Sequence, residues 1–178
     1  MKAFINIIGD IGKGYFNEKD AQIVELVDVI TQVEQNKDAS IYHFKINSPG
    51  GLVEEGDKIF DYISSLKAKG KIIITEATNE CASIATKLFL AGTTRIINSD
   101  CFFMIHNPWG GNMGDADEMI EYGKDLKKIE TKLLNEYIQL TGSSLEALSP
   151  LMKQETILSP EQAVQLGFAT EIATIGHK

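Results

Sequence analysis

The stretch KIIITEATNECASIATKLFLAG (71–92) joins a strand signal directly to a helix signal. Its first seven residues (71–77) are rich in β-branched side chains, which favour a buried strand of a parallel sheet. Residues 83–92 then have the pattern of a short apolar helix that ends at Gly92. A strand followed by a helix is the building unit of α/β proteins, so this stretch predicts an α/β fold.

Strand and helix signals alternate along the rest of the chain. Further strands are predicted at residues 3–9, 40–46, 95–98 and 101–106, and further helices at 17–35, 53–69, 115–141, 143–154 and 160–167. The sequence has no linker, low-complexity segment or convincing repeat. We therefore predict one α/β domain over residues 1–178, with a long helix near 115–141.

Capping residues and apolar faces support the helices. Asn17 is a suitable N-cap for the helix at 17–35, and Asp115 with Glu118 forms a capping-box pattern at the start of the longest helix. Near the C-terminus, Ser159 is a suitable N-cap for a helix that begins at Pro160. The apolar face of the first helix would cover the sheet through Ile23, Leu26, Val27, Ile30 and Val33.

The composition excludes several classes of function. The chain has 178 residues, 43% of them hydrophobic, and a net charge of -8, so it would repel phosphate backbones and nucleic acid is an unsuitable partner. The apolar run of residues 1–12 is too short and interrupted for a signal sequence or membrane span. Cys81 and Cys101 lie in apolar segments, which predicts core residues of a reduced, cytoplasmic protein without a metal site.

Three features could carry chemistry. In NSPGGLV (47–53), Gly50 and Gly51 let the backbone turn sharply and approach another group, although an ordinary turn has the same composition. Lysine and glycine spacings typical of nucleotide sites are missing from the sequence. Ser83 stands at a helix N-terminus, where it suits a nucleophile or a simple N-cap. His106 stands at the end of an apolar strand and is either a base or a structural residue.

A serine nucleophile requires a base, and the base requires an acid to fix its tautomer. We select Glu155 as the acid, because it stands at the entry to an apolar segment and could be partly shielded from water with its carboxylate facing inward. Asp115 and Asp117 have the pattern of helix-start residues instead.

Four motifs in order resemble the Clp-type serine proteases over nearly the whole chain. They are NSPGG (47–51), ECASIATKLFLAG (80–92), MIHNPWGG (104–111) and ETILSPEQAVQLGFA (155–169). The stretch from MIHNPWG through GDADEM to TGSSLEAL is most similar to the phage and prophage branch, the head-maturation (prohead) proteases. The resemblance implies the ClpP/crotonase-like superfold, with repeated strand-strand-helix units and a protruding helix.

The resemblance also implies roles for individual residues. Ser83 matches the nucleophile, His106 matches the histidine of the MIHxP motif, and Glu155 takes the place of the family's aspartate. By the same matching, the backbone N–H groups of Gly51 and Ile84 form the oxyanion hole. Substrate would bind along Gly50, Leu52, Val53 and Asn107, by addition of a strand, and Trp109 would line this pocket or contact another subunit.

The family implies a homo-oligomeric ring, usually sevenfold or in two stacked rings, that cuts polypeptides without a metal or cofactor. The chain begins almost at its first strand, which puts partnership with an ATP-driven unfoldase in doubt and favours an ATP-independent endopeptidase of capsid or scaffold protein. The alternatives are the proteolytic subunit of a Clp complex, an inactive structural ring, and a crotonase-type acyl-CoA enzyme. Ser83 with His106 argues against the last.

Overall fold

The computed structural model describes residues 1–14 and 20–173 and has a seven-stranded sheet at its centre. Five parallel strands follow one another across the sheet in the order β1 (Lys2–Ile8), β4 (Ile41–Ser48), β5 (Ile72–Ala82), β6 (Thr94–Asn98) and β9 (Glu171–Ala173). Beside them, β7 (Phe102–Ile105) runs parallel to β5, and β8 (Thr156–Leu158) is antiparallel to β7. The predicted α/β fold is confirmed.

Strand β5 is longer than the sequence pattern predicts and serves two neighbours. Its residues 74–77 pair with β6, whereas residues 80–82 pair with β7. A register shift in its pairing with β4, between Ile46 and Ser48, accompanies this change of partner. The second half of β5 therefore carries the chain directly to Ser83, beside the end of β7.

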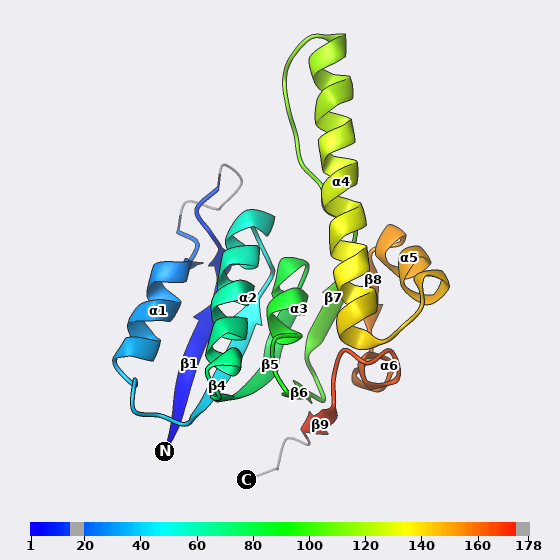
Figure 1. Ribbon diagram of the computed structural model, residues 1–178. Helices are drawn as coiled ribbons and strands as arrows, with labels where there is room; N and C mark the ends of the chain where they lie inside the picture. Colours follow the sequence, from blue (N-terminus) through cyan, green and yellow to red (C-terminus); the bar gives the residue numbers. More distant parts are fainter. Residues whose placement is uncertain (15–19, 174–178) are drawn as a thin grey trace.

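Helices α1 (Leu26–Glu34), α2 (Val53–Ala68) and α3 (Ile84–Phe89) lie on one face of the sheet (Figure 1). In β4 the side chains of Tyr42, Phe44 and Ile46 are buried, as expected for alternate residues that face covering helices. On the neighbouring strands, Phe4 and Ile72 are exposed.

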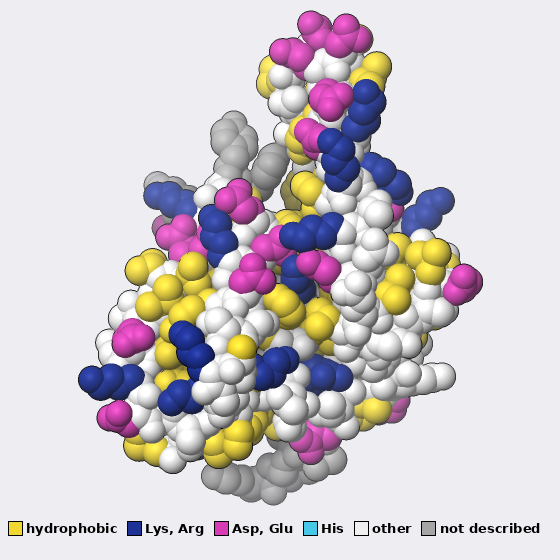
Figure 2. All heavy atoms as spheres, viewed as in Figure 1, with side chains coloured by type: hydrophobic (Ala, Val, Ile, Leu, Met, Phe, Trp, Pro, Cys, Tyr) yellow, Lys and Arg dark blue, Asp and Glu magenta, His cyan; other side chains and the backbone are white. Residues whose placement is uncertain are grey.

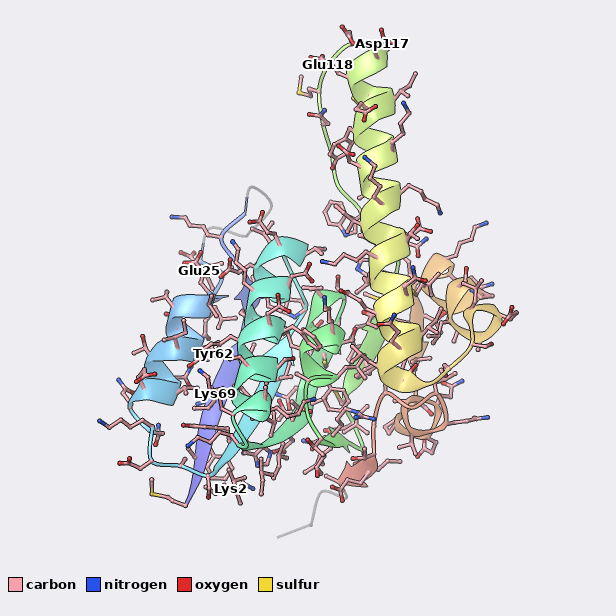
Figure 3. The ribbon with its side chains drawn as sticks, in the orientation of Figure 1. Lys2, Glu25, Tyr62, Lys69, Asp117 and Glu118 are labelled. Atoms are coloured by element: carbon pink, nitrogen blue, oxygen red, sulfur yellow. The ribbon has the colours of Figure 1, made fainter. Side chains whose placement is uncertain are left out.

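Helix α4 (Ala116–Thr141) protrudes from the body of the molecule (Figure 1), followed by α5 (Leu145–Lys153) and α6 (Pro160–Gln165). The predicted capping box of Asp115 and Glu118 is present, and Gly142 ends the helix in the left-handed conformation. Asp117 and Glu118 lie at the far end (Figure 3), and Figure 2 shows lysines further down the helix. Only the base of α4 enters the core, through Leu133 and Tyr137.

The predicted helix at 17–35 is wrong in its first part. Residues Ile23–Val24 form strand β3, which pairs with β2 (Asp10–Ile11), and α1 begins at Leu26 with Glu25 as its N-cap (Figure 3). The predicted cap, Asn17, lies outside the described residues. Two adjacent β-branched residues favour a strand where a partner is available, and that pairing prevails here.

The apolar face predicted for this helix also needs correction. Val27 is 61% exposed, while Val29 and Val33 are the buried residues of α1. Val29 and Val33 are about one helical turn apart and Leu26 packs against the same core, whereas Val27 lies on the opposite side of the helix from Val29.

Both cysteines are buried, as predicted, and both are free thiols. Burial raises the pKa of the Cys101 thiol to about 12 and raises that of Cys81 as well, so both remain protonated at neutral pH. Over the described part of the chain, no helix is long and apolar enough to span a bilayer.

Candidate active site

Ser83 occupies the sharp turn between β5 and α3. Its φ of 54° is in the left-handed region, which a residue with a side chain adopts at a cost of about 1–3 kcal/mol. Its backbone N–H donates to the carbonyl of Met104 at 2.9 Å, which ties the turn to β7. Non-glycine residues in such conformations cluster at functional sites, so the backbone itself marks this serine.

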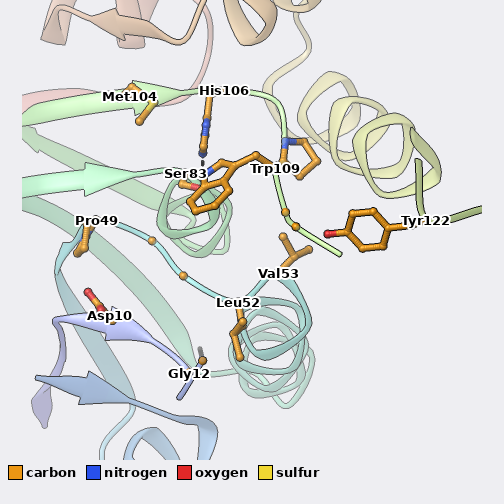
Figure 4. A pocket seen from close by; sticks show the side chains of 16 residues that line it. Asp10, Gly12, Pro49, Leu52, Val53, Ser83, Met104, His106, Trp109 and Tyr122 are labelled. Atoms are coloured by element: carbon orange, nitrogen blue, oxygen red, sulfur yellow. Dashed lines mark hydrogen bonds between the residues drawn. The ribbon is translucent and has the colours of Figure 1, made fainter. Parts of the chain in front are cut away.

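His106 stands one residue beyond β7, and the strand register brings it to Ser83. Ala82 is paired with Met104, so the residues that follow emerge side by side at the same edge of the sheet. The His106 Nε2 atom lies 2.7 Å from Ser83 Oγ (Figure 4). With its proton on Nδ1, the ring accepts a hydrogen bond from the serine at Nε2, as a general base must.

Burial determines the charge of His106. Its side chain is 8% exposed, and this loss of hydration lowers the pKa of the ring, while the negative charge of Glu155 acts in the opposite direction. The net effect is a pKa below the ordinary value for histidine. The imidazole is therefore neutral at pH 7 and able to take a proton.

Glu155 is brought to His106 by the antiparallel pairing of β8 with β7. Ile105 is paired with Thr156, so the residues beyond this pair, His106 and Glu155, are neighbours. The Glu155 Oε1 atom is 3.9 Å from His106 Nδ1, an ion-pair distance that is too long for a hydrogen bond. The expectation that this carboxylate is shielded from water is wrong, because its side chain is 73% exposed.

The glycine turn contacts the serine closely. A side chain at Gly50 would place its Cβ 2.6 Å from the Cβ of Ser83, and one at Gly51 would place it 2.2 Å from the carbonyl oxygen of Ile11. Both glycines have positive φ. Glycine at position 50 therefore permits the close approach of the turn to Ser83, and glycine at position 51 permits its close approach to Ile11.

The N-terminal segment holds this turn in place. The backbone N–H of Ile11 donates to the carbonyl of Gly50 at 2.8 Å, and the N–H of Leu52 donates to the carbonyl of Ile11 at 2.7 Å. A parallel bridge of this kind uses neither polar group of the central residue, Gly51. The Gly51 N–H is thus turned away from Ile11.

Ser83 and His106 border a cavity of about 500 Å³ (Figure 4). Four residues selected from the sequence line it with them, Gly50, Gly51, Leu52 and Val53. Asn107, Ile84 and Glu155 are not among the lining residues. The Asn107 backbone N–H instead donates to the carbonyl of Met152 at 3.0 Å.

Other lining residues escaped the sequence analysis. Met104 and Tyr122 border the cavity. Trp109 borders it as well, in agreement with the first of the two positions expected for it, the pocket or a subunit contact. Tyr122 extends from α4 toward the cavity (Figure 4). Its place on a mostly charged helix gave no signal, because contact with the cavity depends on how the protruding helix is set against the body.

A model of the family described as Clp protease matches residues 8–176. This chain belongs to the Clp protease family. Family membership confirms the resemblance seen in the sequence, and together with the Ser83–His106 contact it supports a serine-type endopeptidase.

Three curated relatives carry the name ATP-dependent Clp protease proteolytic subunit. The protein of Oltmannsiellopsis viridis is 30% identical over 86% of this chain and 76% of its own length. That of Chlorella vulgaris is 29% identical over 85% of this chain and 74% of its own. The protein of Mesostigma viride is 28% identical over 84% of this chain. The match covers only 65% of the length of that relative.

Proposed function

We propose that the protein is a serine endopeptidase that works as the proteolytic subunit of an ATP-dependent Clp protease. The observation that carries the chemistry is the 2.7 Å contact between Ser83 Oγ and His106 Nε2 at the edge of an open cavity. The names of the relatives support the place of the subunit in a complex driven by ATP. These names favour a subunit of a Clp complex over a head-maturation protease.

In the proposed mechanism, Ser83 Oγ attacks the carbonyl carbon of the substrate while His106 Nε2 takes its proton. The tetrahedral intermediate expels the amine, which receives that proton from His106, and leaves an acyl group on Ser83. Water then attacks the acyl carbonyl by the same route in reverse and releases the second product. Every step is a proton transfer or an acyl transfer and uses only groups of the chain and water.

The backbone N–H groups of Gly51 and Ile84 are the proposed oxyanion donors. Ile84 is the first residue of α3, so its N–H has no partner within the helix. The Gly51 N–H is turned away from Ile11 by the bridge described above. Each such donor contributes about 3–4 kcal/mol to stabilisation of the transition state.

Glu155 is the proposed third member of the triad. At 3.9 Å and largely in water, its carboxylate acts on His106 through charge rather than through a hydrogen bond. That arrangement favours the imidazolium formed during the reaction, but it fixes the tautomer only weakly.

Substrate recognition and assembly follow the family in this proposal. A peptide would add as a strand along Gly50, Leu52 and Val53, which line the cavity, with Asn107 beyond its rim. Residues 1–178 would act as one domain in a homo-oligomeric ring, sevenfold or in two stacked rings, in the cytoplasm, with an unfoldase supplying substrate.

Head maturation, with capsid or scaffold protein as substrate, is the second candidate. The sequence from MIHNPWG (104–110) through GDADEM (114–119) favours it. An inactive ring and a crotonase-type enzyme both fit less well, because neither requires the observed contact between serine and histidine.

Labelling with a fluorophosphonate tests the chemistry. We expect an adduct on Ser83, located by mass spectrometry, that is lost in Ser83→Ala and strongly reduced in His106→Ala. Ser143→Ala is the matched control, because the Ser143 hydroxyl donates to the carbonyl of Leu166 and lies outside the cavity. A folded, assembled protein without an adduct would favour the inactive ring.

A second experiment separates the two candidate functions. A subunit of a Clp complex should cut short peptides alone but degrade a folded substrate only when a Clp-type unfoldase and ATP are added. A head-maturation enzyme should cut a few sites in unfolded scaffold protein, and ATP with the unfoldase should not change the result.

A further inference from the structure

A buried chain of hydrogen bonds joins the protruding helix to the backbone of the nucleophile. The hydroxyl groups of Tyr137 and Thr86 are 2.5 Å apart. The Thr86 hydroxyl donates to the carbonyl oxygen of Ser83 at 2.7 Å, and the Thr86 backbone N–H donates to the same oxygen at 3.0 Å. Both side chains are fully buried.

The direction of the chain follows from the count of protons. The Thr86 hydroxyl has one proton and uses it on the Ser83 carbonyl, so Tyr137 must be the donor to Thr86. Burial raises the pKa of Tyr137, which keeps the phenol protonated and able to donate. The phenol oxygen is also 3.5 Å from the Ser83 carbonyl, at the outer limit of a hydrogen bond.

The carbonyl held in this way belongs to the peptide that contains the Ile84 N–H. In a trans peptide the C=O and N–H groups point in opposite directions within one plane. Rotation about the Cα–C bond of Ser83, where ψ is −131°, turns both groups together. Fixing the oxygen on the side of Thr86 therefore fixes the direction of the N–H on the other side.

We propose that Tyr137 and Thr86 are positioning residues that hold the Ser83–Ile84 peptide so that the Ile84 N–H stays directed at the oxyanion. Helix α4 thereby supports the reaction from behind the nucleophile, although it is the element that extends furthest from the body. The inference rests on the proposed function, because it deepens the role given there to Ile84.

Other contacts keep α3 in place when the hydroxyl groups are altered. Lys87, the next residue of α3, is bound by Asp57 of α2 at 2.6 Å and by Glu136 of α4 at 2.7 Å. The ring of Tyr137 packs edge-on against Phe168 with centroids 5.3 Å apart. Removing only the Tyr137 hydroxyl thus leaves the packing of both helices and isolates its effect on the peptide.

The test measures cleavage of an internally quenched fluorogenic peptide by Tyr137→Phe, Thr86→Val and Thr86→Ser. We expect kcat to fall about tenfold in the first two variants, less than for complete loss of an oxyanion donor, with KM within about twofold of the parent. Thr86→Ser keeps the hydroxyl and should retain kcat within about twofold. Tyr42→Phe is the matched control, because its hydroxyl donates to the Asn36 carbonyl and neither residue lines the cavity.

Inhibition by a peptide aldehyde gives an independent readout. Its adduct with Ser83 carries an oxygen in the position of the oxyanion, so its inhibition constant should rise by the same factor by which kcat/KM falls. A role confined to folding would instead lower the melting temperature without this parallel. If either Tyr137→Phe or Thr86→Val does not fold, the other variant still tests the positioning role, because both interrupt the same chain of hydrogen bonds.

The outcomes distinguish this inference from the function on which it rests. An inactive parent protein that Ser83-directed fluorophosphonate does not label would overturn the proposed function. An active parent with Tyr137→Phe and Thr86→Val both equal to Tyr42→Phe would overturn only the positioning role. A change confined to KM would also overturn it.

Discussion

Two buried histidines of this protein each have a carboxylate neighbour, but only one of them has a serine. His43 lies in the middle of β4 with its Nε2 atom 2.9 Å from Glu76, whereas His106 lies just beyond β7 with its Nδ1 atom 3.9 Å from Glu155. Burial is the main cause of a lowered pKa at both rings. Burial and the direction of the pKa shift do not separate the two rings, and by carboxylate distance alone His43 would be the better candidate base.

The two histidines differ in what their position in the sheet allows. Among the described residues neither ring nitrogen of His43 has an aligned hydrogen-bond partner, in spite of the short distance to Glu76, and the ring lies against Phe4. His106 lies where β5 and β7 end together, so its ring meets Ser83 and the cavity. A place at the end of neighbouring strands, more than a perturbed pKa, distinguishes the proposed base from the other buried histidine.

Replacement of each histidine by alanine gives the largest expected difference. His106→Ala should lower kcat/KM for a fluorogenic peptide by about 10⁶-fold, because the serine loses its base. His43→Ala should leave kcat/KM within about twofold once corrected for the folded fraction. Equal losses in two variants with native circular dichroism would mean that the serine contact is not functional.

The pH dependence of kcat/KM should report the His106 environment. Because its pKa is lowered, the acid limb of the profile should have its inflection below the ordinary histidine pKa, and activity should fall about tenfold per pH unit below it. His43→Gln should leave the inflection unchanged. An inflection above the ordinary value would contradict the dominance of burial.

Glu155→Gln should have a smaller effect on catalysis. We expect kcat/KM to fall by less than about 100-fold, compared with about 10⁴-fold where a triad carboxylate is hydrogen-bonded to the histidine. Loss of the negative charge should also move the acid limb to lower pH, since Glu155 raises the pKa of His106. Glu76→Gln is the matched control, and a loss near 10⁴-fold in Glu155→Gln would show that the carboxylate closes on the ring during the reaction.

The smallest expected effect is on stability. A histidine whose pKa is lower in the folded protein binds fewer protons than in the unfolded chain, so stability is lost as pH falls below the ordinary histidine pKa. Urea unfolding at pH 7 and pH 5 should show this loss, and His43→Gln should reduce it. An unchanged difference in His43→Gln would assign the loss to other groups.

Local patterns in the sequence account for most of the fold and for the selection of Ser83 and His106 as candidate site residues. The alternation of strand and helix, the capping box at Asp115, and the placement of Ser83 at a helix start all depend on residues near one another in the chain. His106 and the glycine turn were identified in the same way, from breaks at the ends of apolar strands.

What the sequence could not supply depends on pairing between distant segments. Strand β3 forms because β2 is available beside it, which displaced the start of α1 to Leu26. The exposure of Glu155 follows from the pairing of β8 with β7, and a single sequence does not contain this register. The link from Tyr137 to Thr86 joins residues 51 positions apart and left no local pattern.

The left-handed backbone of Ser83 has a consequence for the evolution of this fold. Glycine adopts such a conformation without the steric cost that serine bears, so Ser83→Gly would remove the proposed nucleophile while relaxing the turn. Loss of chemistry at this position therefore carries little penalty for the folded subunit. If the proposed function holds, a lineage that lost the reaction would be free to replace the strained serine and keep the fold.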